Sequence, residues 1–267
     1  MIENIIKDLE NNLNIKVTEK DITYYTDGAT DSIVFNIMDK YLVKTMDDIT
    51  YKTQKEFLEF YNNINEFQTI IHHNEELKYI CFEYKQGSLF RKDKLSSKEA
   101  MEQVYNIVNN YKEYNHDYYG YLYEDEKTWY EFLKDEVEYS NKKMQEANIN
   151  LDKVNNALKI IKEYTTPKYL IHGDFGVHNF IVNNNHIHII DPMPVVGDYL
   201  YDFYFSLYSD TDLFTNLNIE EILSYFDRDI KIKKALLTIT FFIRMSRAYV
   251  YDKPFFHLYT KYYDEVI

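Results

Sequence analysis

Glycine, proline and cysteine are all scarce in this chain of 267 residues, with six, four and one copies respectively. The single cysteine, Cys81, excludes an intramolecular disulfide. No Gly-rich, Ser-rich or Pro-rich tract marks a flexible linker, so any domain boundary must be a short crossover. Hydrophobic residues make up 45% of the chain, which is enough for one large domain or two small ones.

Long hydrophobic runs and an excess of basic residues are also lacking. The longest apolar stretch, near Ala235 to Ile243, is too short to cross a bilayer, and the first residues, MIENIIKDLENNLNI, carry charges where a secretory signal needs an apolar core. We therefore expect a cytoplasmic protein. The formal charge of -14 argues against nucleic acid or an anionic membrane as a partner. It favours a cationic ligand, or simply keeps a tyrosine-rich chain soluble.

The segment IHGDFGVHNF, Ile171 to Phe180, contains the letters DFG, which hold magnesium in protein kinases. Its spacing indicates a different register. His172, Asp174 and Asn179 match HxDxxxxN, the kinase catalytic loop whose Asp positions the attacking hydroxyl and whose Asn binds magnesium. A lone HGD could be a turn beside a strand, but here FIVNNNHIHIIDP follows, which predicts a hairpin ending at Asp191. Asp174 is therefore the candidate catalytic base, and Asn179 and Asp191 are candidate magnesium ligands.

Two features nearer the amino terminus are typical of a nucleotide site. The turn YTDGATDS could bring the backbone of Gly28 and the hydroxyls of Thr30 and Ser32 to a phosphate, although one glycine between strands is usually a hairpin turn. Lys44 lies in the otherwise apolar strand YLVKT, where its ammonium group needs an anionic partner. That partner could be a nucleotide phosphate or Glu56 on the next helical stretch. Alternatively, Lys44 simply ends an exposed edge strand.

The periodicity of the chain predicts an α+β fold in two parts. The first part has a helix, alternating strands and a buried strand, LKYICFEYKQGSLF, that ends in a hinge. Backbone groups near Glu83 and Tyr84 could pair there with an adenine edge. The second part is mostly helical, and its first helix, SSKEAMEQVYNIVNNYKEY, opens with a Ser cap and an acidic first turn. We predict a small N-terminal lobe with an antiparallel sheet and a helix, and a larger, mainly helical C-terminal lobe.

Taken together, these segments resemble the aminoglycoside phosphotransferase and choline kinase family, a branch of the protein-kinase-like fold that phosphorylates hydroxyls of small molecules. The specific part runs from Ile171 to Phe205, where HGDFGVHNF, IIDP and GDYLYDF follow the family pattern. DGATDSIVFNI, YLVKT and KEFLEFY match more loosely but in the right order. The resemblance implies a bilobal fold, with a nucleotide-binding lobe at residues 1–84 and a catalytic and substrate-binding lobe at residues 85–267.

The resemblance also implies an activity, namely transfer of the γ-phosphate of ATP or GTP, with Mg²⁺, to a hydroxyl of an amino sugar or amino alcohol, as in antibiotic resistance. Lys44, positioned by Glu56, would bind the α- and β-phosphates, and Gly28 to Ser32 would cover the nucleotide. Asp198 and Asp202 match later family aspartates that support the catalytic loop. Because Asp202 opens a predicted helix, a plain N-terminal dipole or cap role is the simpler account of it.

Some features depart from the family pattern or leave alternatives open. The nucleotide loop has one glycine, and Asp191 precedes Pro-Met-Pro, which could alter metal geometry. The segment from Asp198 to Asp229 carries eight carboxylates against one basic residue, Arg228, and either attracts the amine of an acceptor or is a solvated helix face. Two other classes remain open. One is a catalytically silent nucleotide-binding protein of the same fold, and the other is a metal-dependent hydrolase that uses HGD and IID as ligands.

Overall fold

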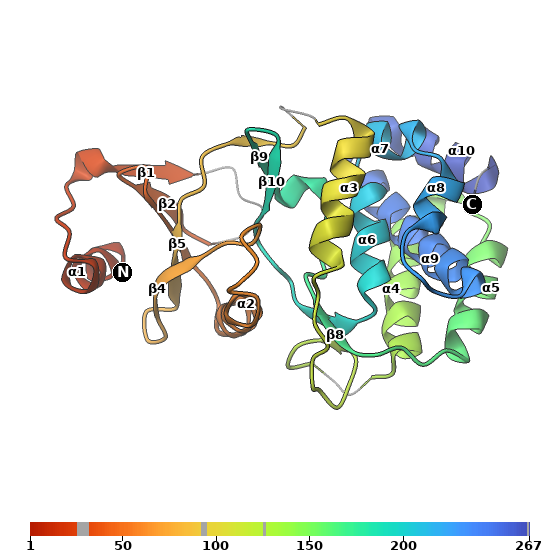
Figure 1. The fold of residues 1–267 in the computed structure, drawn as a ribbon, viewed down its shortest axis with the longest axis horizontal. Coiled ribbons are helices and arrows are strands. Elements are labelled where there is room, and N and C mark those ends of the chain that lie inside the picture. Colours follow the sequence, from red (N-terminus) through yellow and green to blue (C-terminus); the bar gives the residue numbers. More distant parts are fainter. Residues whose placement is uncertain (26–31, 92–94, 125–126, 266) are drawn as a thin grey trace. The chain divides into compact units, whose positions relative to one another are not determined.

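The computed structural model describes residues 1–25, 32–91, 95–124, 127–265 and 267. The chain forms two compact units (Figure 1). Unit 1 comprises Met1–Leu89 and Phe180–Met193, and unit 2 comprises Phe90–Asn179 and Pro194–Ile267. The predicted boundary after residue 84 did not include the return of Phe180–Met193 to the first unit, because no linker composition marks it.

Unit 1 is built on a five-stranded antiparallel sheet with the strand order β1-β2-β3-β5-β4. A second, three-stranded sheet has the order β10-β9-β6. The helices and strands of unit 1 are α1 (Ile2–Leu13), β1 (Ile22–Tyr25), β2 (Val34–Ile37), β3 (Tyr41–Thr45), α2 (Asp48–Phe60), β4 (Ile70–Asn74), β5 (Tyr79–Glu83), β6 (Ser88–Leu89), β9 (Phe180–Asn183) and β10 (His186–Ile189).

The core of unit 1 lies between α1 and one face of its larger sheet. Ile5 and Leu9, one turn apart on α1, are fully buried against Phe35 and Val43 of neighbouring strands. Figure 1 shows α1 on one side of this sheet and α2 on the other. The amino end of α2 is capped by Asp47, which accepts hydrogen bonds from two backbone N–H groups of the first turn.

Unit 2 is mostly helical, and the long helix α9 packs against α4, α5, α6 and α10 (Figure 1). The predicted cap of its first helix is present, since Ser96 and Glu99 form a capping box. A small sheet has the strand order β7-β11-β8. The helices and strands of unit 2 are α3 (Ser97–Val108), β7 (Gly120–Tyr121), α4 (Trp129–Lys143), α5 (Asp152–Lys162), β8 (Tyr169–Ile171), β11 (Val195–Gly197), α6 (Tyr199–Leu207), α7 (Thr211–Asn216), α8 (Ile219–Ser224), α9 (Ile230–Tyr251) and α10 (Phe256–Glu265).

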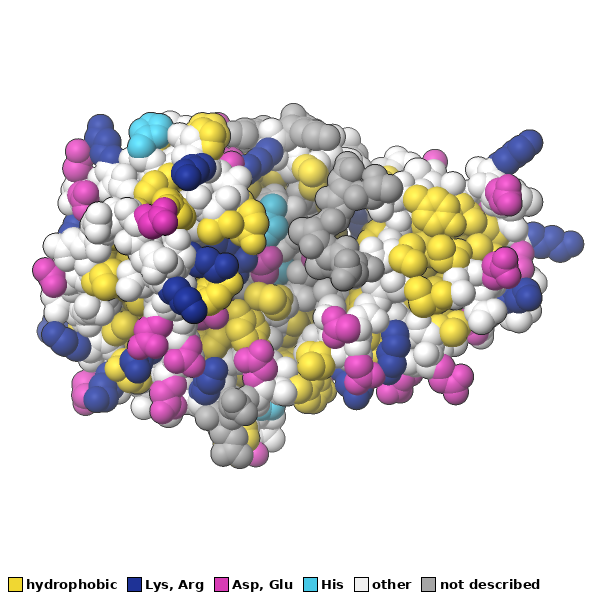
Figure 2. All heavy atoms as spheres, turned by 180° about the vertical axis from the view of Figure 1, so that it is seen from behind, with side chains coloured by type: hydrophobic (Ala, Val, Ile, Leu, Met, Phe, Trp, Pro, Cys, Tyr) yellow, Lys and Arg dark blue, Asp and Glu magenta, His cyan; other side chains and the backbone are white. Residues whose placement is uncertain are grey.

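These two units confirm the predicted α+β class, with an antiparallel sheet and helices in the first and mainly helices in the second. Acidic and basic side chains are intermixed on the face that Figure 2 draws. Within the described ranges, no helix is both long and apolar enough to cross a membrane.

Candidate active site

The loop after β8 is held in place by a buried carboxylate on α6. Asp202 is fully buried and accepts hydrogen bonds from the backbone N–H groups of His172, at 2.7 Å, and Gly173, at 3.1 Å. Gly173 adopts a φ of 79°, a conformation that favours glycine. The hydroxyl of Tyr111 donates to the same carboxylate at 2.8 Å. Burial raises the pKa of Asp202 to about 7, although all three donors favour its charged form.

Of the two simpler accounts of Asp202, the cap is wrong, whereas the dipole role fits, because Asp202 lies in the first turn of α6. The cap is Asp198, whose carboxylate accepts a hydrogen bond from the Leu200 N–H at 3.0 Å and from the Thr166 hydroxyl at 2.8 Å. Asp202 lies one turn further along the helix, where its side chain reaches the loop instead of the helix end. The sequence offered two aspartates four residues apart, and only the start of the helix decides which of them is the cap.

The two carboxylate oxygens of Asp174 have different surroundings. Its Oδ2 lies 2.9 Å from His178 Nε2 and 3.2 Å from Asn179 Nδ2. Its Oδ1 is buried, and no hydrogen-bond donor reaches it among the residues that the structure describes. Burial alone would raise the pKa of Asp174, but the hydrogen bond from His178 and the charges of His178, Arg247 and Arg244 outweigh it, so the pKa lies well below its ordinary value. The carboxylate is therefore charged, and one of its oxygens is left to accept a hydrogen bond.

His178 was not among the predicted site residues. Its ring folds back over Gly176, where a Cβ atom would lie only 2.6 Å from the ring carbon Cε1. The missing side chain at Gly176 is thus what lets the imidazole reach Asp174. The spacing of four residues between Asp174 and His178, with a glycine between them, was the available signal.

The side-chain amide of Asn179 is held by Asp174. Its amide nitrogen donates to the backbone carbonyl of Asp174 at 2.9 Å and also to the Asp174 carboxylate. Both contacts fix the NH₂ side of the amide and direct its carbonyl oxygen away from Asp174. A carbonyl oxygen is the kind of atom that magnesium binds, so the residue fits its predicted role.

In unit 1, Lys44 and Asp191 form an ion pair with 2.6 Å between Nζ and Oδ1. Lys44 lies on β3, in the middle of the sheet between β2 and β5, and its side chain is 12% exposed. The alternative of an exposed edge strand is therefore wrong. Asp191 follows β10 with a φ of 56°, and its N–H donates to Gln68 Oε1 at 3.2 Å. Its side chain is 41% exposed, so a cation can reach the carboxylate.

The predicted nucleotide loop is described only in part, because Gly28 and Thr30 lie outside the described residues. Ser32 is half-buried and precedes β2. Glu56 is half-buried on α2, and its pairing with Lys44 stays a prediction.

The predicted hinge residues, at the end of β5, already use their backbone N–H groups. Glu83 donates to the carbonyl of Thr69 and Tyr84 to the carbonyl of Lys40, both at 2.9 Å. An adenine edge that pairs with this segment would therefore need its carbonyl groups or the next N–H groups along the chain.

The acidic segment from Asp198 to Asp229 is largely used for local structure. Asp198, Asp210 and Asp229 cap the starts of α6, α7 and α9, and Asp202 holds the loop described above. Glu220 and Glu221 lie in the first turn of α8, where acidic residues are favoured by the helix dipole. The idea that this segment attracts an amine therefore rests on net charge alone.

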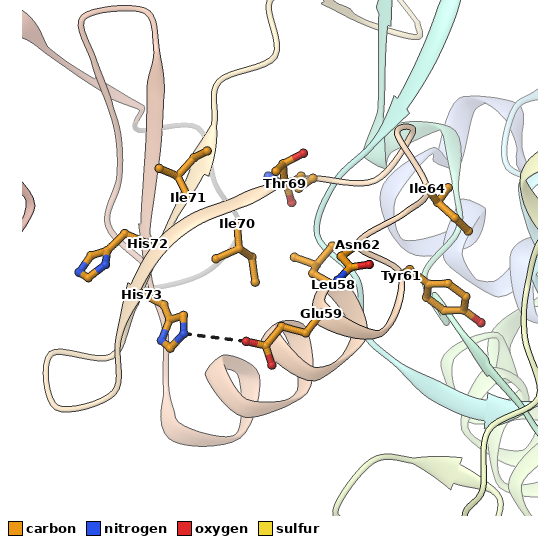
Figure 3. Close-up of a pocket in the computed structure, with 11 residues that line it drawn as sticks. Leu58, Glu59, Tyr61, Asn62, Ile64, Thr69, Ile70, Ile71, His72 and His73 are labelled. Atoms are coloured by element: carbon orange, nitrogen blue, oxygen red, sulfur yellow. Dashed lines mark ion pairs between the residues drawn. The ribbon is translucent and has the colours of Figure 1, made fainter. Parts of the chain in front are cut away.

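Figure 3 shows a partly open hollow in unit 1, between the end of α2 and β4. Its volume is about 380 Å³, and Glu59 and His73 point toward each other across part of it, 3.9 Å apart. Gln68, which also lines it, accepts the hydrogen bond from the N–H of Asp191. None of the predicted site residues lines this hollow within the described part of unit 1.

Comparison with known proteins gives a likeness in structure without a match in sequence. No protein-family model matches the chain, and no curated protein matches it. A protein described as a fructosamine-3-kinase from Haemophilus somnus is similar over 100% of this chain and 98% of its own, with 14% identity and a TM-score of 0.65. A choline kinase from Cryptosporidium parvum is similar over 98% of this chain and 94% of its own, with 13% identity and a TM-score of 0.61.

An aminoglycoside phosphotransferase, solved with AMP-PNP and hygromycin B, is similar over 98% of this chain and 96% of its own, with 15% identity and a TM-score of 0.60. At these identities the likeness concerns the fold. The chain thus has the fold of these small-molecule kinases, and the fold that the motifs predicted is confirmed.

Proposed function

We propose that this protein is a small-molecule kinase that transfers the γ-phosphate of ATP or GTP to a hydroxyl group. The observation that carries the proposal is the carboxylate of Asp174, with Oδ2 engaged by His178 and Asn179 and Oδ1 buried without a donor from the described residues. A hydroxyl group of an acceptor would supply that donor. Because the pKa of Asp174 is low, its main role is to orient the hydroxyl, which suits a transfer that depends on positioning.

The residues of the donor side would be Lys44, Asp191 and Asn179. Lys44 would exchange its ion pair with Asp191 for the α- and β-phosphates of the nucleotide, while Asp191 and the amide oxygen of Asn179 would hold magnesium. The metal would supply charge neutralisation on the phosphate oxygens. Gly28, Thr30 and Ser32 remain the proposed cover of the nucleotide, and the backbone near Glu83 and Tyr84 its proposed adenine contact.

For the acceptor we propose a hydroxyl-bearing amine, such as an amino sugar or amino alcohol. The support is the net charge of -14, which favours a cation over an anion at long range. The fold is shared with proteins named as aminoglycoside phosphotransferases and choline kinases, which adds to the expectation.

The test is nucleotide consumption by Asp174→Asn in the presence of a panel of amino sugars and amino alcohols. We expect turnover to fall by at least about 100-fold, because the hydroxyl loses its orienting carboxylate. Nucleotide binding should remain near that of the wild type, measured by magnesium-dependent thermal stabilisation with ATP and with GTP. Asp227→Asn, an exposed aspartate of unit 2, is the matched control and should retain full turnover.

Turnover by Asp174→Asn within a few fold of the wild type would remove Asp174 from this role. Stabilisation by nucleotide without turnover of any acceptor would favour the silent nucleotide-binding alternative.

A further inference from the structure

Two arginines of α9 lie on one helix face beside Asp174. Arg244 and Arg247 are three residues apart, which places both side chains on the same side of the helix. Nη1 of Arg247 is 3.7 Å from Oδ1 of Asp174, which is too long for a hydrogen bond. The other oxygen of that carboxylate is taken by His178 and Asn179. Asp174 therefore neutralises part of this positive charge without satisfying its N–H donors.

Arg244 is the more deeply buried of the two, with 6% of its surface exposed. Its guanidinium lies 4.7 Å from the ring centre of Phe205, and one N–H group makes a long contact of 3.5 Å to the carbonyl of Ser209. Its Nε is buried and has no hydrogen-bond partner in the described chain. Burial lowers the pKa of Arg244, and a buried cation with an unsatisfied donor is costly unless an anion offsets it.

Arg247 is the more accessible of the two, with a side chain that is 31% exposed. Its guanidinium stands 5.5 Å from the same ring of Phe205, and none of the hydrogen bonds found between described residues uses its N–H groups. Glu136 is the other acidic neighbour, but burial raises its pKa, and it accepts a hydrogen bond from the Tyr121 hydroxyl at 3.3 Å. Arg247 thus has a partly exposed side chain whose guanidinium lies next to the buried Oδ1 of Asp174, the oxygen without a hydrogen-bond donor from the described residues.

We propose that Arg247, with Arg244 behind it, binds an anionic group of the acceptor, either a carboxylate or a phosphate. The planar guanidinium pairs with both groups through two parallel hydrogen bonds. Because Arg247 lies beside Oδ1 of Asp174, the anionic group and the reacting hydroxyl are separated by only a few bonds. The inference rests on the proposed kinase function but revises the class of its acceptor. The net charge acts at long range and is screened by salt, whereas the two arginines act at the site itself, so the acceptor becomes a short hydroxy acid, with or without an amine, or a hydroxyl compound bearing a phosphate.

A purely supporting role for Arg247 predicts a different result. If Arg247 only holds the Asp174 carboxylate, its loss lowers kcat for every acceptor alike. If it binds an anionic group, its loss raises KM for anionic acceptors and leaves their uncharged counterparts unaffected.

The experiment compares acceptors in pairs: glycerol with glycerate, glycerol with glycerol 3-phosphate, and 3-amino-1-propanol with homoserine. Thermal stabilisation is measured with and without magnesium nucleotide, and kcat and KM are measured for each compound that is phosphorylated. The proteins are the wild type, Arg247→Gln, Arg247→Lys and the control Lys234→Gln. Lys234 is exposed on α9 and about 20 Å along the helix from Arg247.

We expect at least one anionic compound to stabilise the wild type more than its partner does. Arg247→Gln should weaken its binding, or raise its KM, by at least about 30-fold with kcat within about threefold. Arg247→Lys should recover part of the loss, because lysine keeps the positive charge but cannot form the two parallel hydrogen bonds of a guanidinium. Lys234→Gln should behave as the wild type. Stabilisation by glycerate or homoserine would indicate a site for a carboxylate, and stabilisation by glycerol 3-phosphate would indicate a site for a phosphate.

The inference is overturned if no anionic compound stabilises the protein, if uncharged or amine partners bind as well, or if Arg247→Gln lowers kcat for all acceptors equally. Turnover of uncharged or amine acceptors would then leave the kinase proposal standing. If no nucleotide stabilises the protein, the kinase proposal is removed instead. Thermal stabilisation by the anionic compounds without nucleotide would still test whether Arg247 binds an anion.

Discussion

At the scale of single residues, the candidate site combines groups that the sequence could indicate with groups that it could not. The spacing of Asp174 and Asn179 is local, so the letters alone predicted that they belong to one loop. Arg247 lies 73 positions after Asp174 and on a different element, and nothing in the sequence relates the two. His178 lies inside the HGDFGVHNF motif, but its contact with Asp174 depends on the imidazole ring folding back over Gly176, which only the structure shows.

Gly176 offers a way to remove the contact of His178 without changing either partner. In Gly176→Ala the added Cβ would lie 2.6 to 2.7 Å from the ring of His178, so the ring must swing out into solvent. We expect turnover to fall about tenfold, the size of a lost hydrogen bond to a charged group, with little change in stability. Steady-state kinetics and thermal unfolding measure the two effects.

The control for this prediction is a double-mutant cycle. His178→Ala alone should cause a similar fall, and Gly176→Ala combined with His178→Ala should cause no further one. Additive losses would mean that Gly176 acts on the loop by another route.

At the scale of elements, periodicity and caps predicted most of the helices and strands, because burial of one face leaves a repeating pattern in the sequence. The contacts between different helices and strands are harder to predict from the sequence. Asp8 on α1 accepts hydrogen bonds from His72 and Asn74 of β4 and from the hydroxyl of Tyr79 on β5, at 2.5 to 3.1 Å. Each of these residues is ordinary in its own segment, and only the packing of α1 on the sheet brings them together.

Asp8→Ala should destabilise unit 1 by about 2 kcal/mol at pH 7, because three donors lose a charged acceptor. Burial opposes the effect of these hydrogen bonds, which together hold the pKa of Asp8 below its ordinary value of 3.8. A lowered pKa in the folded state means that the stabilisation is present above pH 3.8 and is lost as the pH falls through the folded pKa. Urea unfolding followed by circular dichroism should therefore show a smaller difference from the wild type at pH 3 than at pH 7.

Lys7→Ala, on the exposed side of the same helix, controls for changes in helix propensity and should leave the stability within about 0.5 kcal/mol. An Asp8→Ala difference that is equal at both pH values would contradict an electrostatic origin.

At the scale of the whole molecule, the fold was predicted well and the division into units less well. The chain leaves unit 1 after Leu89, forms helices α3, α4 and α5 of unit 2, returns to unit 1 with the hairpin β9–β10, and then forms the remaining helices of unit 2. This hairpin pairs with β6, and the N–H of Ile189 donates to the carbonyl of Glu66 at 2.7 Å. Such long-range pairing has no sequence signal, because the strands match any partner of similar apolar pattern.

A fragment of residues 1–89 should consequently be less stable than the same fragment joined by a short Gly-Ser linker to residues 180–193. The hairpin buries Val182, Ile187 and Ile189 and gives β6 its hydrogen-bond partner. Thermal unfolding by circular dichroism should show a midpoint at least about 5 °C higher for the linked form. A linked form in which Ile187 and Ile189 are both replaced by Ser controls for the added length, and equal midpoints for all three would exclude a structural role of the hairpin.

The late return of this hairpin also sets the order in which the protein can mature during translation. When the ribosome has made the first 89 residues, the edge that β6 offers has no partner, and the carboxylate that pairs with Lys44 has not been synthesised. About 100 further residues must emerge before both arrive, and most of these belong to unit 2. The amino-terminal part therefore waits in an incomplete state, and synthesis and folding cannot proceed in the same order along this chain.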